Sequence, residues 1–276
     1  MKRFLAVLLL TGCIVKKEEI HNHPCVVVPP KASEIREVLI NGELANPKDW
    51  PTIFKSKHGN ALCTSASVGP YTLQVAAHCI TGAKSAEIEK DGVKYTGVCT
   101  PHTGFKGDPS ADYALCKLDK ELALPWYETI TSEEVKLGDD LLLTGMGCTQ
   151  PGGGPSDWKL RIGKAEVVEL PTNDNDIVVH GGAALCFGDS SSAAFMKDSK
   201  GELKVAAINS RGDIYEYSYL SAVYTDTAKE FYSKWASDNK VEICGVTKDA
   251  KKCRGIEPVP PPPGPTPPGP QPECPK

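Results

Sequence analysis

The sequence predicts an all-β protein of short antiparallel strands that close into barrels, followed by one C-terminal helix. Residues 52–135 alternate short apolar runs with Gly, Pro, Asn and Asp, and residues 136–224 repeat this pattern. Residues 225–239 place Phe231 and Trp235 four positions apart, the spacing of one face of an amphipathic helix. A chain of 276 residues can enclose one large all-β domain or two barrels that share an interface.

The first residues have the composition of an export signal. Lys2-Arg3 precedes an apolar run over residues 4–10 that is too short to span a bilayer. Leu10-Thr-Gly-Cys13 resembles a bacterial lipobox, in which the signal is removed before a cysteine that is diacylated. We therefore expect residues 1–12 to be a lipoprotein signal peptide, which leaves 276 − 12 = 264 residues. The chain would be exported and lipid-anchored through Cys13 to a bacterial membrane, on its periplasmic or cell-surface face; the alternative is an ordinary cleaved signal with an incidental cysteine.

Charge and cysteine content narrow the class of protein. The net charge of −4, with both signs mixed along the chain, leaves no basic stripe, so we expect no nucleic-acid partner. Of the 11 cysteines, ten follow Cys13, an even number and a high density that fit an oxidising compartment. Cysteine usage therefore agrees with export.

Two segments outside the strand pattern are expected to be connecting chain. Residues 13–38 contain scattered prolines and little periodic pattern, which indicates a tether or pro-segment. Its His21-Asn-His-Pro-Cys25 holds three potential metal ligands, but such residues in a linker are more often solvated, and we expect no metal there. Residues 244–276 form a cysteine-containing, proline-rich tail, a solvated spacer rather than a recognition ligand. Cys25 and Cys274 could pair with each other, and the sequence does not assign them.

A candidate nucleophile lies in the segment Cys186-Phe-Gly-Asp-Ser-Ser-Ser-Ala-Ala-Phe195. A serine hydroxyl is a poor nucleophile, and it needs a base for its proton and donors for the oxyanion that follows. Gly188 allows a tight turn in which the amides of Gly188 and Ser190 converge above Ser190 Oγ. Taken alone, Gly-Asp-Ser is also common in solvated turns.

A base and a carboxylate occur elsewhere in the chain. His78 lies in an apolar, strand-like run, Gln74-Val-Ala-Ala-His-Cys-Ile80, and Asp112 heads the alternating segment 111–118. The order His78, Asp112, Ser190 is one of the known chain orders of a catalytic triad. An imidazole in an apolar strand is often only a core residue, but the adjoining cysteine and the aspartate favour catalysis. In that role Asp112 accepts the Nδ1 proton and stabilises the imidazolium.

At these residues the chain resembles the trypsin-like (chymotrypsin-fold) serine proteases. Six segments match in order from about residue 39 to residue 239: Asn41-Gly-Glu-Leu-Ala-Asn-Pro-Lys-Asp-Trp-Pro51, Val75-Ala-Ala-His-Cys79, Asp112-Tyr-Ala-Leu115, Leu143-Thr-Gly-Met-Gly147, Cys186-Phe-Gly-Asp-Ser190 and Ala222-Val-Tyr-Thr225. The resemblance implies two antiparallel six-stranded β-barrels, a triad in the cleft between them, a C-terminal helix, and a protease domain over residues 39–243. It also implies a protein or peptide substrate and no cofactor, and it leaves the oligomeric state open.

The resemblance extends to the strand that binds substrate. Val205-Ala-Ala-Ile-Asn-Ser-Arg-Gly212 is similar to the segment along which the substrate backbone lies, with Ser210 hydrogen-bonding Asp112. Arg211 stands where the family usually has an aromatic shelf, which would alter recognition without touching the chemistry.

The specificity pocket follows from the same register. Gly212 would leave the pocket open, its floor falls on Ala184, and Ala222 faces that floor. A lysine or arginine would be buried there without a partner, so we expect an apolar residue before the scissile bond, of small or medium aliphatic size.

Activation in this family frees an ammonium that pairs with the aspartate before the catalytic serine. By resemblance, the new terminus is Leu39 and its partner is Asp189. The residue before the cut is Val38 and not the usual arginine, so another protease cuts the chain, or it cuts itself, or no cut occurs. A buried, unpaired carboxylate is costly and would disorder the loop that carries Ser190, so we expect an uncut molecule to be inert.

We expect four disulfides. Cys63 and Cys79 match the family's histidine-loop disulfide, which would hold His78 in place. The other three pairs are Cys99 with Cys116, on strands expected to be neighbours, Cys148 with Cys186, because the family's usual partner after Gly212 is missing, and Cys244 with Cys253, which would close a local loop.

One departure from the family pattern lies at the nucleophile itself. Ser190 is followed by Ser191-Ser192-Ala193, where two glycines and a proline are usual. If these side chains distort the turn, the amides of Gly188 and Ser190 no longer converge on the oxyanion. Loss of one such donor lowers the rate roughly 10²- to 10³-fold. The alternative function is therefore a catalytically impaired pseudo-protease, a surface lipoprotein that binds peptides or proteins. The intact triad and the Gly188-Asp189 turn favour a serine endopeptidase.

Overall fold

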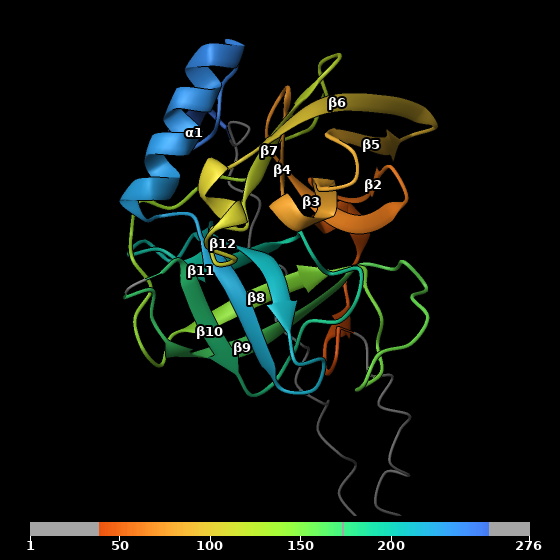
Figure 1. Ribbon diagram of the computed structural model, residues 1–276, viewed down its shortest axis with the longest axis vertical. Coiled ribbons are helices and arrows are strands. Elements are labelled where there is room, and N and C mark those ends of the chain that lie inside the picture. The colour runs from red at the N-terminus through yellow and green to blue at the C-terminus, as the bar shows by residue number, and fades with distance from the viewer. Residues whose placement is uncertain (1–38, 173, 254–276) are drawn as a thin grey trace, which may run out of the picture. The chain divides into compact units, whose positions relative to one another are not determined.

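The computed structural model describes residues 39–172 and 174–253. Its first six-stranded barrel is closed and antiparallel throughout, in the order β2-β3-β4-β7-β6-β5 (Figure 1). In β2, Lys55 and Lys57 are exposed while Phe54, Ser56 and His58 are buried, because successive side chains of a strand point to opposite faces. The strands are β2 (Ile53–His58), β3 (Ala61–Gly69), β4 (Thr72–Val75), β5 (Ser85–Lys90), β6 (Val93–Pro101) and β7 (Ala114–Leu118).

The second barrel has the order β9-β10-β13-β12-β11-β8 and closes through the pairing of β8 with β9. The two-residue strand β1 (Glu43–Leu44) pairs with β9 as an addition to this sheet. The barrel strands are β8 (Asp140–Gly145), β9 (Arg161–Glu169), β10 (Asp176–His180), β11 (Ala193–Lys197), β12 (Leu203–Gly212) and β13 (Tyr217–Ala222).

The helix α1 (Asp226–Asn239) lies alongside β7 in Figure 1 and packs on both barrels. Its buried Tyr232 and Trp235 belong to one apolar cluster with Leu115 of the first barrel and Phe195 of the second, and Phe231 packs partly buried against the same cluster. Burial of these rings stabilises the contact between the barrels, at roughly 25 cal/mol per Å² of apolar surface. The predicted fold class, two antiparallel six-stranded barrels with a C-terminal helix, is confirmed.

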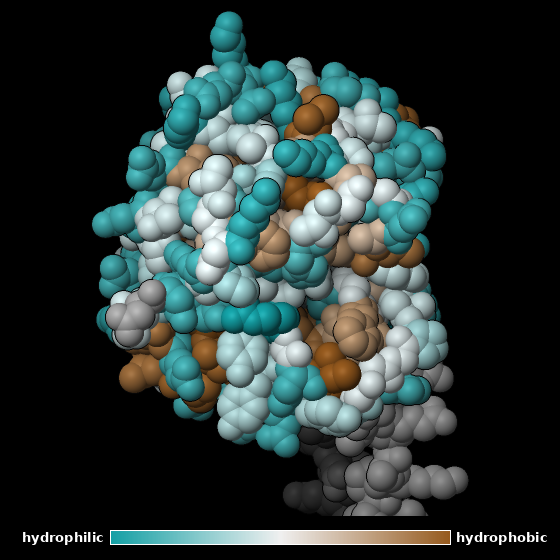
Figure 2. Space-filling view, in the orientation of Figure 1, coloured by the Kyte–Doolittle hydropathy of each residue, from teal (hydrophilic) through white to brown (hydrophobic). Residues whose placement is uncertain are grey.

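Each barrel also has an apolar core of its own. Leu73 and Ile88 lie in the core of the first barrel, and Leu141 and Ile177 lie in that of the second. Figure 2 shows one face of the molecule, where hydrophilic side chains cover most of the surface and hydrophobic ones form small separate areas. The alternating pattern of the sequence therefore directs apolar side chains inward.

Three short 3-10 helices lie between strands of the described chain, η1 (Pro47–Asp49), η2 (Ala77–Ile80) and η3 (Thr103–Lys106), and a fourth, η4 (Ala250–Lys252), follows α1. Within the described part of the chain, no helix combines the length and the apolar character needed to cross a bilayer. The expected signal peptide, the tether with Cys13 and Cys25, and Cys274 lie outside the described residues.

Among the described residues, four disulfides join the pairs of cysteines that were expected. Cys63–Cys79 connects β3 to η2, and Cys99–Cys116 joins directly opposed residues of β6 and β7. Cys148–Cys186 ties the segment after β8 to the segment that carries Ser190. Cys244–Cys253 closes a loop that lies against the first barrel, where Cys244 N donates to Val68 O at 2.9 Å.

Candidate active site

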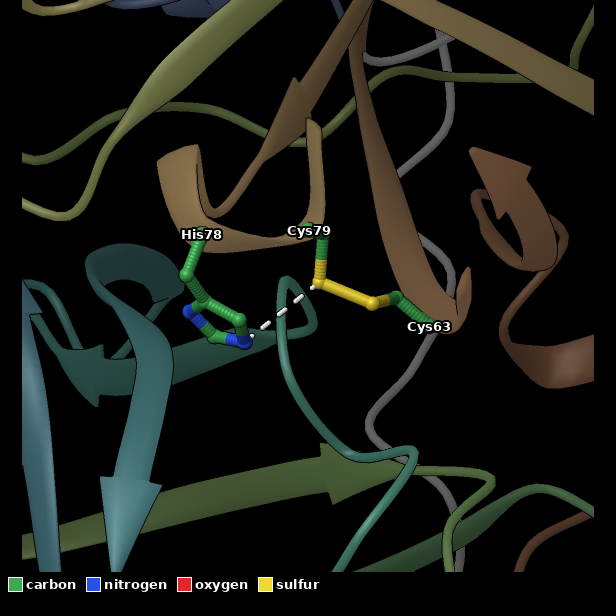
Figure 3. Close-up of side chains that lie close together, drawn as sticks. All are labelled: Cys63, His78 and Cys79. Atoms are coloured by element: carbon green, nitrogen blue, oxygen red, sulfur yellow. Dashed lines mark hydrogen bonds between the residues drawn. A yellow bond between two sulfur atoms is a disulfide. The ribbon is translucent and has the colours of Figure 1, made fainter. Parts of the chain in front are cut away.

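His78 lies on η2, directly after β4, and a disulfide holds the helix from one side. Figure 3 shows the imidazole beside Cys79, whose sulfur is bonded to that of Cys63. The potential ligand atoms of Cys63, His78 and Cys79 all lie within 4.8 Å of one another. Zinc binds cysteine as the thiolate, and these two sulfurs are bonded to each other, so the cluster presents only the imidazole.

Asp112 lies just before β7 and is 1% exposed. Its Oδ2 accepts from Nδ1 of His78 at 2.6 Å, and its Oδ1 accepts from the backbone N of His78 at 2.8 Å. Ser210 Oγ also donates to Oδ2, at 2.6 Å. Because an ionised carboxylate can only accept, the proton of the neutral imidazole lies on Nδ1, and the lone pair lies on Nε2. Nε2 is therefore available as a base.

Ser190 belongs to the same hydrogen-bonded group of residues. Its Oγ donates to the carbonyl oxygen of Ser210 at 3.4 Å, and Ser210 Oγ in turn binds Asp112. Nε2 of His78 lies 3.5 Å from Cys79 Sγ, and among the described residues no direct hydrogen bond joins it to Ser190 Oγ. Ser210 thus brings the serine, the aspartate and the histidine together at the interface of the barrels.

The turn before Ser190 leaves two amides free. Neither Gly188 N nor Ser190 N donates a hydrogen bond to any described residue, whereas Asp189 N between them donates to Cys186 O at 3.1 Å. Gly188 has φ +101°, and a Cβ there would lie 3.0 Å from Gly147 Cα, so both backbone conformation and space require glycine. Two free amides two positions apart in a tight turn are suited to binding an oxyanion.

The trypsin family model, described as Trypsin, matches residues 39–236. The chain belongs to the trypsin family. The match covers both barrels and most of α1, and this membership confirms the resemblance found in the sequence. A search of curated proteins found no match.

In this trypsin-family chain the side chain of Asp189 is fully buried beneath residues 188–191, which hold the candidate nucleophile and are here named the nucleophile turn. Gly147 N donates to its Oδ1 at 2.7 Å and Cys186 N donates to its Oδ2 at 2.9 Å. A Cβ on Gly145 would overlap Oδ1, so the carboxylate occupies space that only glycine leaves free. Burial raises the pKa of Asp189 to about 7, although the two amides lower it.

The expected activation terminus lies in the interior of the second barrel. Leu39 is 0% exposed and packs among core residues, and Ile40 O accepts from Ala184 N at 2.9 Å. Among the described residues, no cation forms an ion pair with Asp189. The charge of Arg161 also lowers the pKa of Asp189, but the Arg161 guanidinium forms its ion pair with Asp157.

Ala184 and Ala222, the residues expected to form the specificity pocket, are 1% and 0% exposed. A Cβ on Gly212 would lie 2.8 Å from Tyr217 O and 3.7 Å from Leu185 Cβ. A side chain at position 212 would therefore collide with the backbone of Tyr217.

Arg211 is held by a residue that the sequence did not single out. Its guanidinium forms a two-pronged ion pair with Asp176, one arm of which is 3.2 Å long, and it lies 5.0 Å from the ring centroid of Tyr219. Asp176 begins β10, and no local sequence pattern marks it as a partner of Arg211. The place of the family's aromatic shelf is thus taken by a charge-neutralised pair on a tyrosine.

Proposed function

We propose that this protein is a serine endopeptidase that hydrolyses peptide bonds through an acyl-enzyme. The observation that carries the proposal is the Asp112–His78 pair, linked through Ser210 to Ser190 beside two free amides. The trypsin-family domain supports a peptide or protein substrate.

In this mechanism Ser190 Oγ attacks the carbonyl carbon while His78 Nε2 takes its proton. Asp112 keeps the imidazole in the Nδ1–H tautomer and stabilises the imidazolium, and the amides of Gly188 and Ser190 bind the oxyanion. The C–N bond then breaks, and the imidazolium protonates the leaving amine. Water, deprotonated by the same Nε2, hydrolyses the acyl-enzyme. For this attack the Ser190 hydroxyl turns from Ser210 O, to which it donates at 3.4 Å, to Nε2 of His78.

The preferred substrate residue before the scissile bond is small or medium and aliphatic. Support comes from the small apolar side chains of Ala184 and Ala222, both of which are buried. A cation placed at Ala184 would lose its hydration without gaining a carboxylate. The same preference would allow the protein to cut after its own Val38.

Cleavage before Leu39 is the proposed activation step. The buried Asp189 accepts only neutral amides from the described residues, and an ammonium at Leu39 would supply the missing charge. Pairing would favour the ionised carboxylate and stabilise the turn that carries Ser190.

Export and anchoring through Cys13 complete the proposal, and they rest on the first residues of the sequence and on the cysteine content. Mass spectrometry of the mature N-terminus tests both steps. A chain that begins at acylated Cys13 would support anchoring, a chain that begins at Leu39 would support the cleavage, and an intact Met1 would contradict both.

Labelling with a fluorophosphonate tests the activity. The chain beginning at Leu39 should be labelled at Ser190, the uncut chain should react much more slowly, and Ser190→Ala should remain unlabelled. Ser192→Ala is the matched control, because it removes a neighbouring hydroxyl that is buried away from the reaction. A folded Leu39 chain that takes up no label would overturn the proposal.

A further inference from the structure

Thr64 of β3 holds the nucleophile turn from the side of the first barrel. Its backbone N donates to Ser190 O at 2.9 Å, and its Oγ1 donates to Gly188 O at 2.8 Å. Thr64 is 0% exposed and follows Cys63, which is bonded to the neighbour of His78. One residue of the first barrel therefore binds both carbonyls that flank Asp189.

The Thr64 hydroxyl has a second partner, in the second barrel. Met146 N donates to Thr64 Oγ1 at 3.1 Å, so the hydroxyl uses its proton and a lone pair at once. The next amide, Gly147 N, binds the Asp189 carboxylate. Thr64 thus connects the turn to the segment that binds the aspartate beneath it.

Ser191 ties the other end of the turn to the residues around His78. Its Oγ accepts from Ala76 N at 2.6 Å, across 115 positions of sequence. Ala76 is the N-cap of η2, and its own side chain provides no capping hydrogen bond. Without Ser191 Oγ, this amide would be buried without a partner, which costs more than the hydrogen bond itself is worth.

The backbone of Ser191 indicates that its hydroxyl matters. Its φ is +74°, in the left-handed region that glycine occupies at little cost and serine does not. A serine in this conformation is strained, and the bond to Ala76 N is the contact that glycine could not make.

Resting on the proposed function, we infer that Thr64 and Ser191 are positioning residues whose hydroxyls clamp the turn 188–191 onto the barrel that carries His78. Gly188 O and Ser190 O belong to the peptide planes that directly follow the two free amides in the chain, so the bonds from Thr64 restrict the backbone torsions of Gly188 and Ser190 on which the direction of those amides depends. With Ser191 held by Ala76 N, the nucleophile keeps its distance from η2. A small error in the distance between Ser190 and the helix that carries His78 would lower the rate of acyl transfer strongly.

Ser192 provides a matched control. It is also 0% exposed, and its Oγ lies 2.7 Å from Thr144 Oγ1 of β8, so this bond stays within the second barrel. Ser192→Ala should lower the melting temperature without moving the turn relative to His78.

The first experiment measures hydrogen exchange of the full chain by mass spectrometry, in a peptide that covers residues 187–191. Thr64→Val and Ser191→Ala should each speed exchange about tenfold there, whereas Thr64→Ser and Ser192→Ala should change it less than twofold. If Thr64→Val and Ser191→Ala exchange like Ser192→Ala, the inference fails. This readout needs no activity, so it still decides the matter if the wild-type chain takes up no label and the proposed function falls.

The second experiment measures kcat and KM on a peptide, and the rate of fluorophosphonate labelling, for the chain that begins at Leu39. Thr64→Val and Ser191→Ala should lower kcat and labelling about tenfold with KM within twofold, and Thr64→Ser should recover most of the rate. Ser191→Gly removes both the strain and the hydroxyl, and we expect it to be slow as well. Full activity of Ser191→Gly would show that only the backbone matters and would overturn the role of the hydroxyl.

Discussion

Both carboxylate oxygens of Asp112 bind the same residue, His78. Oδ2 accepts from the imidazole Nδ1 at 2.6 Å, and Oδ1 accepts from the backbone amide at 2.8 Å. The two contacts fix the position of η2 and the orientation of its ring together. The carboxylate is almost fully buried and accepts a third hydrogen bond, from Ser210. Its oxygens therefore have little freedom to exchange partners.

Asp112→Asn is predicted to lower the labelling rate and kcat by roughly 10⁴ while the fold is retained. An amide at this position can still accept from the His78 backbone, but it directs an N–H toward Nδ1 and so favours the tautomer whose Nε2 carries the proton. Stopped-flow acylation checks the prediction. Asp108→Asn, four positions earlier, is the control and should be acylated at the wild-type rate. If Asp112→Asn is acylated less than tenfold more slowly than the wild type, the role assigned to Asp112 is wrong.

Ala184→Asp is predicted to change the preferred residue before the scissile bond from aliphatic to lysine or arginine. The new carboxylate would pair with the substrate cation and would leave an aliphatic side chain next to a buried charge. To check this prediction, a peptide library is cleaved by the unaltered chain and by Ala184→Asp, and mass spectrometry identifies the residue before each cleaved bond. Cleavage after lysine or arginine by the unaltered chain would refute the apolar specificity.

We predict that the buried carboxyl group of Asp189 makes the free energy of unfolding of the uncut chain depend on pH in an unusual direction. Burial raises the pKa of Asp189 to about 7, against about 3.9 when unfolded, so between these values the folded chain holds a proton that the unfolded chain releases. The free energy of unfolding should therefore fall as pH rises from about 4 to about 7, by at most ~1.4 kcal/mol per pH unit, and level off above.

Urea unfolding of Ser190→Ala chains, uncut or beginning at Leu39, measures this effect without self-cleavage. The chain beginning at Leu39 should lose less stability over the same range, because its ammonium favours the ionised carboxylate. Asp189→Asn in the uncut chain should remove the dependence that Asp189 causes. If the free energy of unfolding changes with pH equally in uncut chains with aspartate and with asparagine at position 189, the pKa of Asp189 is not raised.

The disulfides Cys148–Cys186 and Cys244–Cys253 are predicted to differ in their contributions. They span sequence separations of 38 and 9, so replacing each pair by alanine should cost about 4 and about 2.5 kcal/mol of unfolding free energy from loop closure. Only the first pair pins the segment before Gly188, so its loss should also slow labelling. Denaturant titration and labelling of the two double variants check both effects, and equal losses would mean that native-state strain outweighs loop length.

Local patterns account for what could be predicted. Alternation of apolar residues predicted the strands, the spacing of Phe231 and Trp235 predicted α1, and the segments around His78, Asp112 and Ser190 predicted the family. Each of these signals lies within about ten residues of chain, where covalent geometry limits the possible structures.

The contacts that decide the details of the site lie beyond that range. Thr64 meets Gly188 across 124 positions and Arg211 meets Asp176 across 35, and neither pair has a local signature. The same is true of Ser191, for which the sequence predicted only a side chain where glycine is usual.

By itself, the sequence determined the two-barrel fold and the family, and it named the histidine, aspartate and serine that the proposed mechanism uses. Only the tertiary structure decided that Ser191 is accommodated by a bond from Ala76 N, and that Ser190 Oγ donates to Ser210 O. The physical reason is that strand and turn preferences act between near neighbours in the chain, whereas hydrogen-bond partners of buried hydroxyls are chosen by how distant segments pack.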